Sequence, residues 1–290
     1  MSDYGIKMLA DKAPVRTVAI DTTETVAEAV QRHGTRPTAS AALGRLITAA
    51  ALFGATMKDE KRVTLRLLGD GPLGTLIADA LPNGEVRGYV QNPQVDLPLN
   101  EAGKLNVGEA VGKNGLFAVA RDYGSGSPYI GSSPLISGEV GEDVANYFVH
   151  SEQIPSVVSL GVLVAPDGGI RAAGGILVQA MPGCGPEVLE QLEKNSHLLS
   201  NISWQIDKGA TPAELASAAL RELEPQVTTR FGVQFSCHCS KERIQAILLG
   251  LGDQDLDEMI QSEEPAEVRC HFCNKTYLFG KEELLAMRQG

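Results

Sequence analysis

Four closely spaced cysteines near the end of the chain constrain its folding more than any other feature. The stretch QFSCHCSKER places Cys237 and Cys239 one residue apart, and CHFCNKTY places Cys270 and Cys273 two residues apart. Four thiolates in two close pairs suit a tetrahedral metal ion, for which zinc is the usual choice. Residues 231–290 offer few apolar side chains for a core, so a bound metal would supply much of their folding free energy.

The same spacing permits a second state for these thiols. Cys237 is near enough to Cys239 for a disulfide if the metal leaves, and Cys270 is equally near Cys273. Metal-bound cysteines are thiolates, the form that oxidants attack, and their oxidation would remove the metal ligands. Spacing alone therefore leaves open both a structural zinc staple and a redox switch.

The remaining candidates for metal binding are weaker. His238 and His271 lie beside the thiols, but four thiolates already complete a tetrahedron, so we expect both histidines to be bystanders. Cys184, in PGCGP, has no second thiol or cationic residue next to it in the sequence. We therefore assign it no reactive role.

Composition argues against several classes of partner. The 290 residues carry a net charge of −11, whereas nucleic acids and anionic membranes both attract positive surfaces. Within residues 230–290, seven Lys or Arg are outnumbered by ten Asp or Glu, which is unlike a basic nucleic-acid module. We therefore expect no binding to nucleic acid or membrane.

The sequence also suggests a compartment. MSDYGIKMLADK lacks the basic start and apolar run of a secretory signal. The most apolar stretch, AALGRLITAAALFGATM, contains Arg45 and is too short to cross a bilayer, so it predicts a buried helix. We expect a cytoplasmic protein, where cysteines serve metal or redox chemistry more often than stable disulfides.

Periodicity predicts an α+β fold in three parts, of which the first is a large mixed domain over residues 1–180. Short strands there alternate with turns such as GDGP, PNG and PDGG, and Ala-rich helices are expected over 22–33 and 38–53. Residues 181–230 are expected to form a helical linker of marginal stability, because its helices are short and their apolar faces need a neighbour. Its sequence TPAE, from Thr211, predicts a capping box.

The third part, residues 231–290, is predicted to be a small zinc-binding domain. Helices are expected over 240–249, 253–261 and 281–288, with a strand, a tight turn and a returning strand over 267–279. The second cysteine pair lies in that turn, which would bring its two sulfur atoms toward one ion.

Motifs for enzymatic chemistry are weak. GDGPLG lacks the Gly-Lys-Ser/Thr ending of a phosphate loop, and GSSPLISG lacks a nucleophile elbow. Cys270 and Cys273 could serve a thiol–disulfide oxidoreductase, but the thioredoxin-like strand and helix expected around such a pair are absent. If the four thiols form a redox switch, the protein would bind its partners only after oxidation. The two alternatives are a thiol–disulfide oxidoreductase and an adaptor that is held folded by zinc and binds its partners constitutively.

Motifs along nearly the whole chain resemble one known family. They are DTTETVAEAVQRH, PTASAALGRLITAAAL, GDGPLGTLIADA, RGYV, GEVGEDVANYFVHSEQIPS and RAAGGILVQAMPG, followed by Cys-x-Cys and Cys-x-x-Cys. In this combination and order, the chain resembles the redox-regulated, thirty-three-kilodalton heat-shock holdase, a bacterial cytosolic chaperone.

The resemblance implies a function without enzymatic turnover. In the reduced, inactive form, one zinc ion would be held by Cys237, Cys239, Cys270 and Cys273. Oxidation would join Cys237 to Cys239 and Cys270 to Cys273, release the zinc, and unfold first the zinc-binding domain and then the linker. The active form, a homodimer, would bind unfolding client proteins without ATP and prevent their aggregation during oxidative stress.

Overall fold

The chain divides by its internal contacts at Ser236, directly before the first cysteine pair. The computed structural model describes residues 2–262 and 264–289, and its two units are residues 1–236 and 237–290. Each unit contains both helices and strands, which confirms the predicted α+β class. The residues of the predicted linker, 181–230, pack within the first unit, and their separate role stays a prediction.

Two β-sheets form the frame of the first unit. The first sheet has the order β10-β1-β2-β9-β8, made of β1 (Tyr4–Ala10), β2 (Val15–Asp21), β8 (Ser156–Val164), β9 (Ile170–Ala180) and β10 (Pro225–Gly232). The second has the order β11-β5-β4-β3-β6-β7, made of β3 (Arg62–Leu68), β4 (Thr75–Ala80), β5 (Glu85–Val90), β6 (Leu116–Asp122), β7 (Tyr129–Pro134) and β11 (Gln234–Phe235). Neighbouring strands run antiparallel, apart from β11, which lies parallel to β5.

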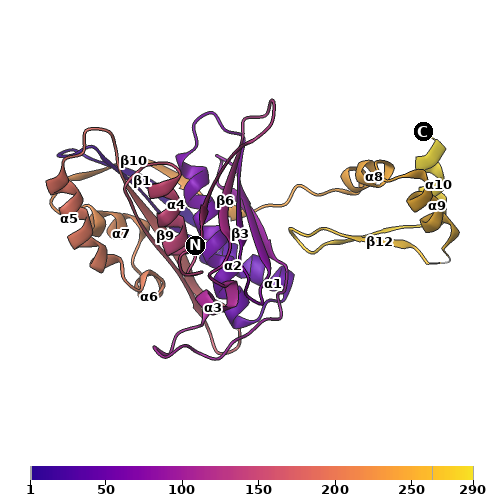
Figure 1. The fold of residues 1–290 in the computed structure, drawn as a ribbon, viewed down its shortest axis with the longest axis horizontal. Coiled ribbons are helices and arrows are strands. Elements are labelled where there is room, and N and C mark those ends of the chain that lie inside the picture. Colours follow the sequence, from indigo (N-terminus) through magenta and orange to yellow (C-terminus); the bar gives the residue numbers. More distant parts are fainter. Residues whose placement is uncertain (1, 263, 290) are drawn as a thin grey trace. The chain divides into compact units, whose positions relative to one another are not determined.

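Helix α2 (Pro37–Thr56) lies between the two sheets and forms the centre of the core (Figure 1). By length and composition alone α2 could cross a membrane, but 94% of its most apolar window is buried inside the protein. A helix that is apolar on all sides is typical of such a core position, as the sequence predicted. Three further helices complete this layer and its rim, namely α1 (Thr23–His33), α3 (Val107–Val111) and α4 (Gly141–His150).

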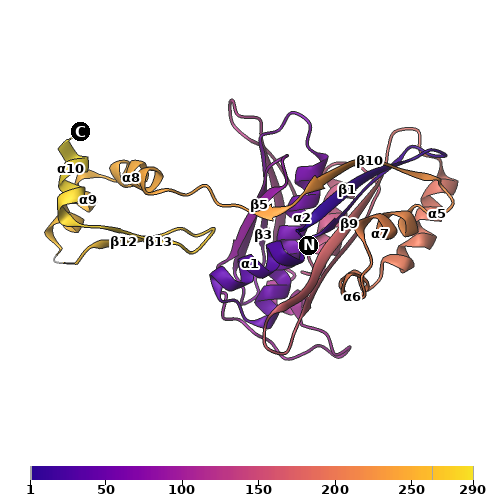
Figure 2. The same ribbon diagram turned by 180° about the vertical axis from the view of Figure 1, so that it is seen from behind.

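Short helices cover the opposite face of the first sheet, and we call them the outer helices. They are α5 (Pro186–Ser196), the 3-10 turn η1 (His197–Leu199), α6 (Ile202–Asp207) and α7 (Pro212–Ala219). Figures 1 and 2 show α5, α6 and α7 on the side of β9 that faces away from α2. Leu199, Ile202 and Leu215 are buried against a sheet face that includes Met8 and Ile176. Helices this short depend on such packing for their stability.

The capping box predicted at the start of α7 is confirmed. The Thr211 side chain accepts a hydrogen bond from the Glu214 amide at 3.3 Å, and the Glu214 carboxylate accepts one from the Thr211 amide at 2.8 Å. A local sequence rule thus fixes where this helix begins.

The helical prediction for 181–230 fails from Pro225 onward. Strand β10 pairs with β1 along the edge of the first sheet, and β11 follows it beside β5 in the second sheet. Most side chains of β10 are exposed, so the strand carries little apolar alternation. Its position is set by backbone hydrogen bonds to β1, which a side-chain pattern does not report.

Two opposed glycines allow α6 to lie very close to the first sheet. Gly161 of β8 pairs in register with Gly174 of β9. A Cβ atom at Gly161 would lie 2.6 Å from the Ser203 amide nitrogen, and one at Gly174 would lie 2.4 Å from the Ile206 Cδ1 atom. A side chain at Gly161 would therefore push the α6 backbone away from the sheet, and one at Gly174 would displace the Ile206 side chain and clash with the Ile20 carbonyl oxygen of β2.

The second unit combines a β-hairpin with short helices. Its elements are α8 (Lys241–Leu249), α9 (Asp253–Gln261), β12 (Ala266–Arg269), β13 (Thr276–Phe279) and α10 (Lys281–Gln289), close to the predicted bounds. The Ser240 side chain caps α8 by accepting a hydrogen bond from the Arg243 amide at 3.2 Å. The apolar core is small and consists of Ile244, Leu248, Leu256, Ile260, Tyr277, Phe279 and Leu284.

Replacement of Gly161 by alanine should loosen α6 without unfolding the rest of the first unit. Overpacking of this kind costs about 1–3 kcal/mol, so amide exchange in residues 202–207 should become roughly tenfold faster or more. Hydrogen–deuterium exchange read by mass spectrometry measures this directly. Gly141→Ala is the matched control, because its Cβ would meet no atom closer than 3.9 Å. Equal exchange in both variants would contradict the close approach described here.

Candidate metal centre

Two separate segments of the second unit bring the four thiols together. Cys237 and Cys239 lie in the extended chain just before α8, while Cys270 and Cys273 lie in the turn that joins β12 to β13. Two backbone hydrogen bonds close that turn, from the Asn274 amide to the Cys270 carbonyl at 2.8 Å and from the Cys270 amide to the Lys275 carbonyl at 2.9 Å.

Asn274 allows the chain to reverse within this turn. Its φ of 59° is in the left-handed region, which asparagine adopts more readily than most residues. The reversal directs both cysteines of the pair toward Cys237 and Cys239, as the tight turn in the sequence predicted.

The four sulfur atoms are spaced as a single metal ion requires. The Sγ atoms of Cys237 and Cys270 lie 3.7 Å apart, those of Cys239 and Cys273 lie 3.3 Å apart, and all four lie within 4.8 Å of one another. Tetrahedral zinc with bonds of about 2.3 Å would separate its sulfur ligands by about 3.8 Å. The four cysteines could therefore hold a metal ion with little rearrangement.

Hydrogen bonding sets one thiol apart from the others. The Tyr277 hydroxyl donates to the Cys239 sulfur at 3.2 Å. Burial raises the pKa of Cys239, but hydrogen bonds from Tyr277 and the neighbouring thiols outweigh burial and bring that pKa to about 7. Burial raises the pKa of Cys270 and of Cys273, and the thiol contacts of Cys273 raise its pKa further. The site thus contains one thiol that is readily ionised even before a metal binds.

Sequence reasoning missed Tyr277. This residue lies on β13, four positions after Cys273, and its ring belongs to the small apolar core. Its hydroxyl reaches Cys239, which is remote in the sequence, only because the hairpin folds against the first cysteine pair. No spacing rule for metal ligands includes such a residue, although hydrogen bonds to ligands commonly support metal sites.

The other cysteine and histidine residues lie outside this cluster. Among the residues that the structure describes, neither His238 nor His271 joins the group of four sulfur atoms. Cys184 belongs to the first unit, where it is half-buried beside the outer helices. Burial, and to a smaller extent Glu187, raises the pKa of Cys184, so its thiol is less reactive than an ordinary cysteine.

Comparisons with known proteins cover nearly the entire chain. A family described as Hsp33 protein matches residues 3–280. The 33 kDa chaperonin of Bacillus licheniformis is 49% identical over 286 residues, which are 99% of this chain and 99% of that protein. The 33 kDa chaperonin of Bacillus pumilus is 47% identical over 287 residues, which are 99% of this chain and 98% of that protein.

A solved structure agrees with the fold. The 33 kDa chaperonin, or heat shock protein 33 homolog, of Thermotoga maritima matches with a TM-score of 0.92 at 37% identity, over 99% of this chain and 98% of that chain. Both the sequence and the fold thus match along nearly the whole length, the thiol-bearing unit included. The chain belongs to the Hsp33 family of heat-shock chaperones.

Proposed function

We propose that this protein is a redox-regulated chaperone that holds unfolding client proteins without using ATP. Membership of the Hsp33 family supports the chaperone activity. The redox regulation is proposed because four cysteine sulfur atoms cluster in a unit with a very small core. Such a unit would fold when the sulfurs share a metal and unfold when oxidation removes them as ligands.

Zinc fits this set of donors best. Four thiolates in a tetrahedron are a common structural zinc site, and soft sulfur ligands disfavour magnesium and calcium. The donors would be Cys237, Cys239, Cys270 and Cys273, whose sulfur spacing already approaches that geometry. Bound zinc would supply the link between the chain before α8 and the hairpin of β12 and β13.

Oxidation would convert these thiols into two disulfides. In each pair, two thiolates give two electrons to hydrogen peroxide, which takes up two protons and leaves as two molecules of water. We infer the pairing of Cys237 with Cys239 and of Cys270 with Cys273 from the family resemblance and from their proximity in the chain. The sulfur contacts of 3.7 Å and 3.3 Å join one segment to the other, but crossed disulfides would keep those segments tied together. Disulfides within each neighbouring pair would leave the two segments without a covalent link, so both could unfold.

Loss of the second unit would then destabilise the outer helices. Cys237 directly follows the segment that contains β10 and β11, so unfolding can spread along the chain into these edge strands. The outer helices precede them and depend on packing against the first sheet. Their departure would expose apolar side chains on both surfaces, and large apolar patches bind other unfolded chains.

Loss of the edge strands β10 and β11 would also favour the proposed homodimer. When β10 and β11 leave, the edges of β1 and β5 lose their partners. Unpaired strand edges favour association with another chain, including a second copy. We further propose a cytoplasmic location, where reduced thiols and bound zinc are the resting state.

The enzymatic alternative has less support. Cys270 and Cys273 lie in a hairpin turn and not at the start of a helix, where a helix dipole would activate a redox pair. Cys273 is buried and its pKa is raised, mainly by burial, which disfavours a nucleophilic role. A constitutive adaptor would use the same metal site but would not respond to oxidants.

One experiment separates the three functions. Reduced, zinc-loaded protein is treated with peroxide at elevated temperature while a colorimetric chelator reports zinc release and light scattering reports aggregation of a heat-unfolding client. We expect suppression of aggregation to appear together with zinc release. Equal suppression by the reduced and oxidised forms would favour the adaptor, and catalytic reduction of insulin would favour the oxidoreductase.

Replacement of Tyr277 by phenylalanine should weaken metal binding while the core stays packed. The variant loses the hydrogen bond to the Cys239 sulfur, and loss of such supporting contacts typically lowers metal affinity by about 10- to 100-fold. Competition with a chelator of known zinc affinity measures the change. Tyr129→Phe is the control, because Tyr129 is exposed in the first unit. Unchanged zinc affinity in Tyr277→Phe would show that the hydroxyl does not support the site.

The order of unfolding provides a further prediction. After oxidation and zinc loss, amide exchange should accelerate in the second unit and in residues 186–219 before it changes in α2, because α2 is buried between two sheets. Exchange measured at successive times after oxidation tests this order. Unchanged exchange in residues 186–219 would contradict the proposed link between zinc loss and undocking of the outer helices.

Gly161→Ala, which loosens α6, should also suppress aggregation of a client protein without oxidant.

A further inference from the structure

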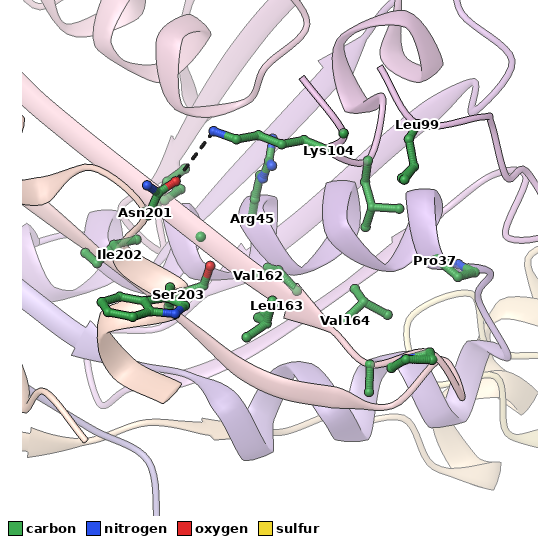
Figure 3. A pocket seen from close by; sticks show the side chains of 17 residues that line it. Pro37, Arg45, Leu99, Lys104, Val162, Leu163, Val164, Asn201, Ile202 and Ser203 are labelled. Atoms are coloured by element: carbon green, nitrogen blue, oxygen red, sulfur yellow. Dashed lines mark hydrogen bonds between the residues drawn. The ribbon is translucent and has the colours of Figure 1, made fainter. Parts of the chain in front are cut away.

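A cavity of about 900 Å³ lies where the outer helices meet the first sheet. Figure 3 shows Val162, Leu163 and Val164 of β8 along its length, with Leu99 and Ile202 at its margins. Its walls are mostly apolar, and its volume is within the range of pockets that hold small molecules. Two of the residues that line it, Leu99 and Trp204, are 60% and 56% exposed, so an occupant would cover apolar surface that water now contacts.

Positive charge is concentrated in one part of this cavity. Arg45 of α2 and Lys104 both line it, and Figure 3 shows the Lys104 side chain reaching Asn201. The Lys104 ammonium lies 3.5 Å from the Asn201 side-chain oxygen and forms no salt bridge in the described part of the chain. Arg45 pairs with Glu139 through one terminal nitrogen, but its buried Nε has no hydrogen-bond partner.

These charges define the kind of ligand. Arg45, Lys104 and Glu139 together leave one net positive charge, which a monoanion would balance. The apolar walls suit a hydrocarbon chain, which gains free energy from every buried methylene group. We propose that the cavity binds one molecule of a carboxylate with a long alkyl chain, with its head group at Lys104 and Arg45 and its chain along β8 toward Trp204.

Occupancy of this cavity would stabilise the docked outer helices. Its walls come partly from β8, α2 and the loop that contains Lys104, and partly from residues 201–204 at the start of α6. The complete cavity exists only while α6 is docked, so a ligand would favour that state by mass action. This consequence rests on the proposed function, and it means that the ligand would delay activation of the chaperone.

Direct binding is measurable because Trp204 is the single tryptophan of the chain. Dodecanoate is titrated into the reduced, zinc-loaded protein below its micelle concentration. We expect a saturable blue shift of the tryptophan emission, and roughly tenfold weaker binding in Lys104→Gln, which loses a charge-assisted contact. The control is Lys113→Gln, whose exposed lysine lies outside this cavity, and it should bind as the unaltered protein does.

Further ligands test the chemistry of the site. Dodecanol, which lacks the charge, should bind more weakly than dodecanoate, and phosphatidylglycerol vesicles should leave the emission unchanged. A linear response without saturation, equal affinity for dodecanol, or unaltered binding in Lys104→Gln would overturn the carboxylate site. An equally strong shift with vesicles would assign this surface to an anionic membrane and would also overturn the proposal.

A second readout separates this proposal from the proposed function. Saturating dodecanoate should slow amide exchange in residues 202–207 of the reduced protein, and unchanged exchange would refute the stabilising role. That measurement requires neither oxidation nor a client. If dodecanoate slows this exchange but oxidation of the ligand-free protein produces no chaperone activity, the redox proposal fails while the ligand site stands.

Discussion

The packing of short helices onto the outer face of the first sheet is the interaction on which the rest of this structure depends. Helices α6 and α7 have six and eight residues, too few for stable helices alone in water. The glycine pair Gly161 and Gly174 lets α6 approach the strands closely, and this closeness makes the docking specific. It also makes the docking fragile, because a single added methyl group would disrupt it.

With a metal ion bound to its four thiols, the second unit would depend on that ion as the outer helices depend on the sheet. Its core contains few side chains, and its two cysteine segments meet at one point. A structural zinc site contributes on the order of 10 kcal/mol or more, which is comparable with the stability of a whole domain. Removal of the metal would therefore unfold this unit outright, whereas loss of one apolar contact would only weaken it.

Local rules in the sequence predicted much of this structure. The two cysteine pairs, the capping box at Thr211 and the hairpin over β12 and β13 each follow from residue spacing within a short segment. Strand β10 and Tyr277 were missed because their partners are remote in the chain. Strand β10 is held by backbone bonds to β1, and Tyr277 reaches a sulfur nearly forty positions away. The cavity beside β8 was missed for the same reason, since its walls come from four distant segments.

These remote contacts explain why instability in one place can affect another. Strand β10 lies between the outer helices and the first cysteine pair in the sequence, yet it is also an edge strand of the first sheet. Its side chains are mostly exposed, so it contributes backbone hydrogen bonds but little apolar burial. A segment held in this way can leave the sheet at low cost while the sheet itself remains folded around α2. In the proposed mechanism, the first unit would lose its outer layer and still present an intact, newly exposed apolar face, which is the property that a holding chaperone requires.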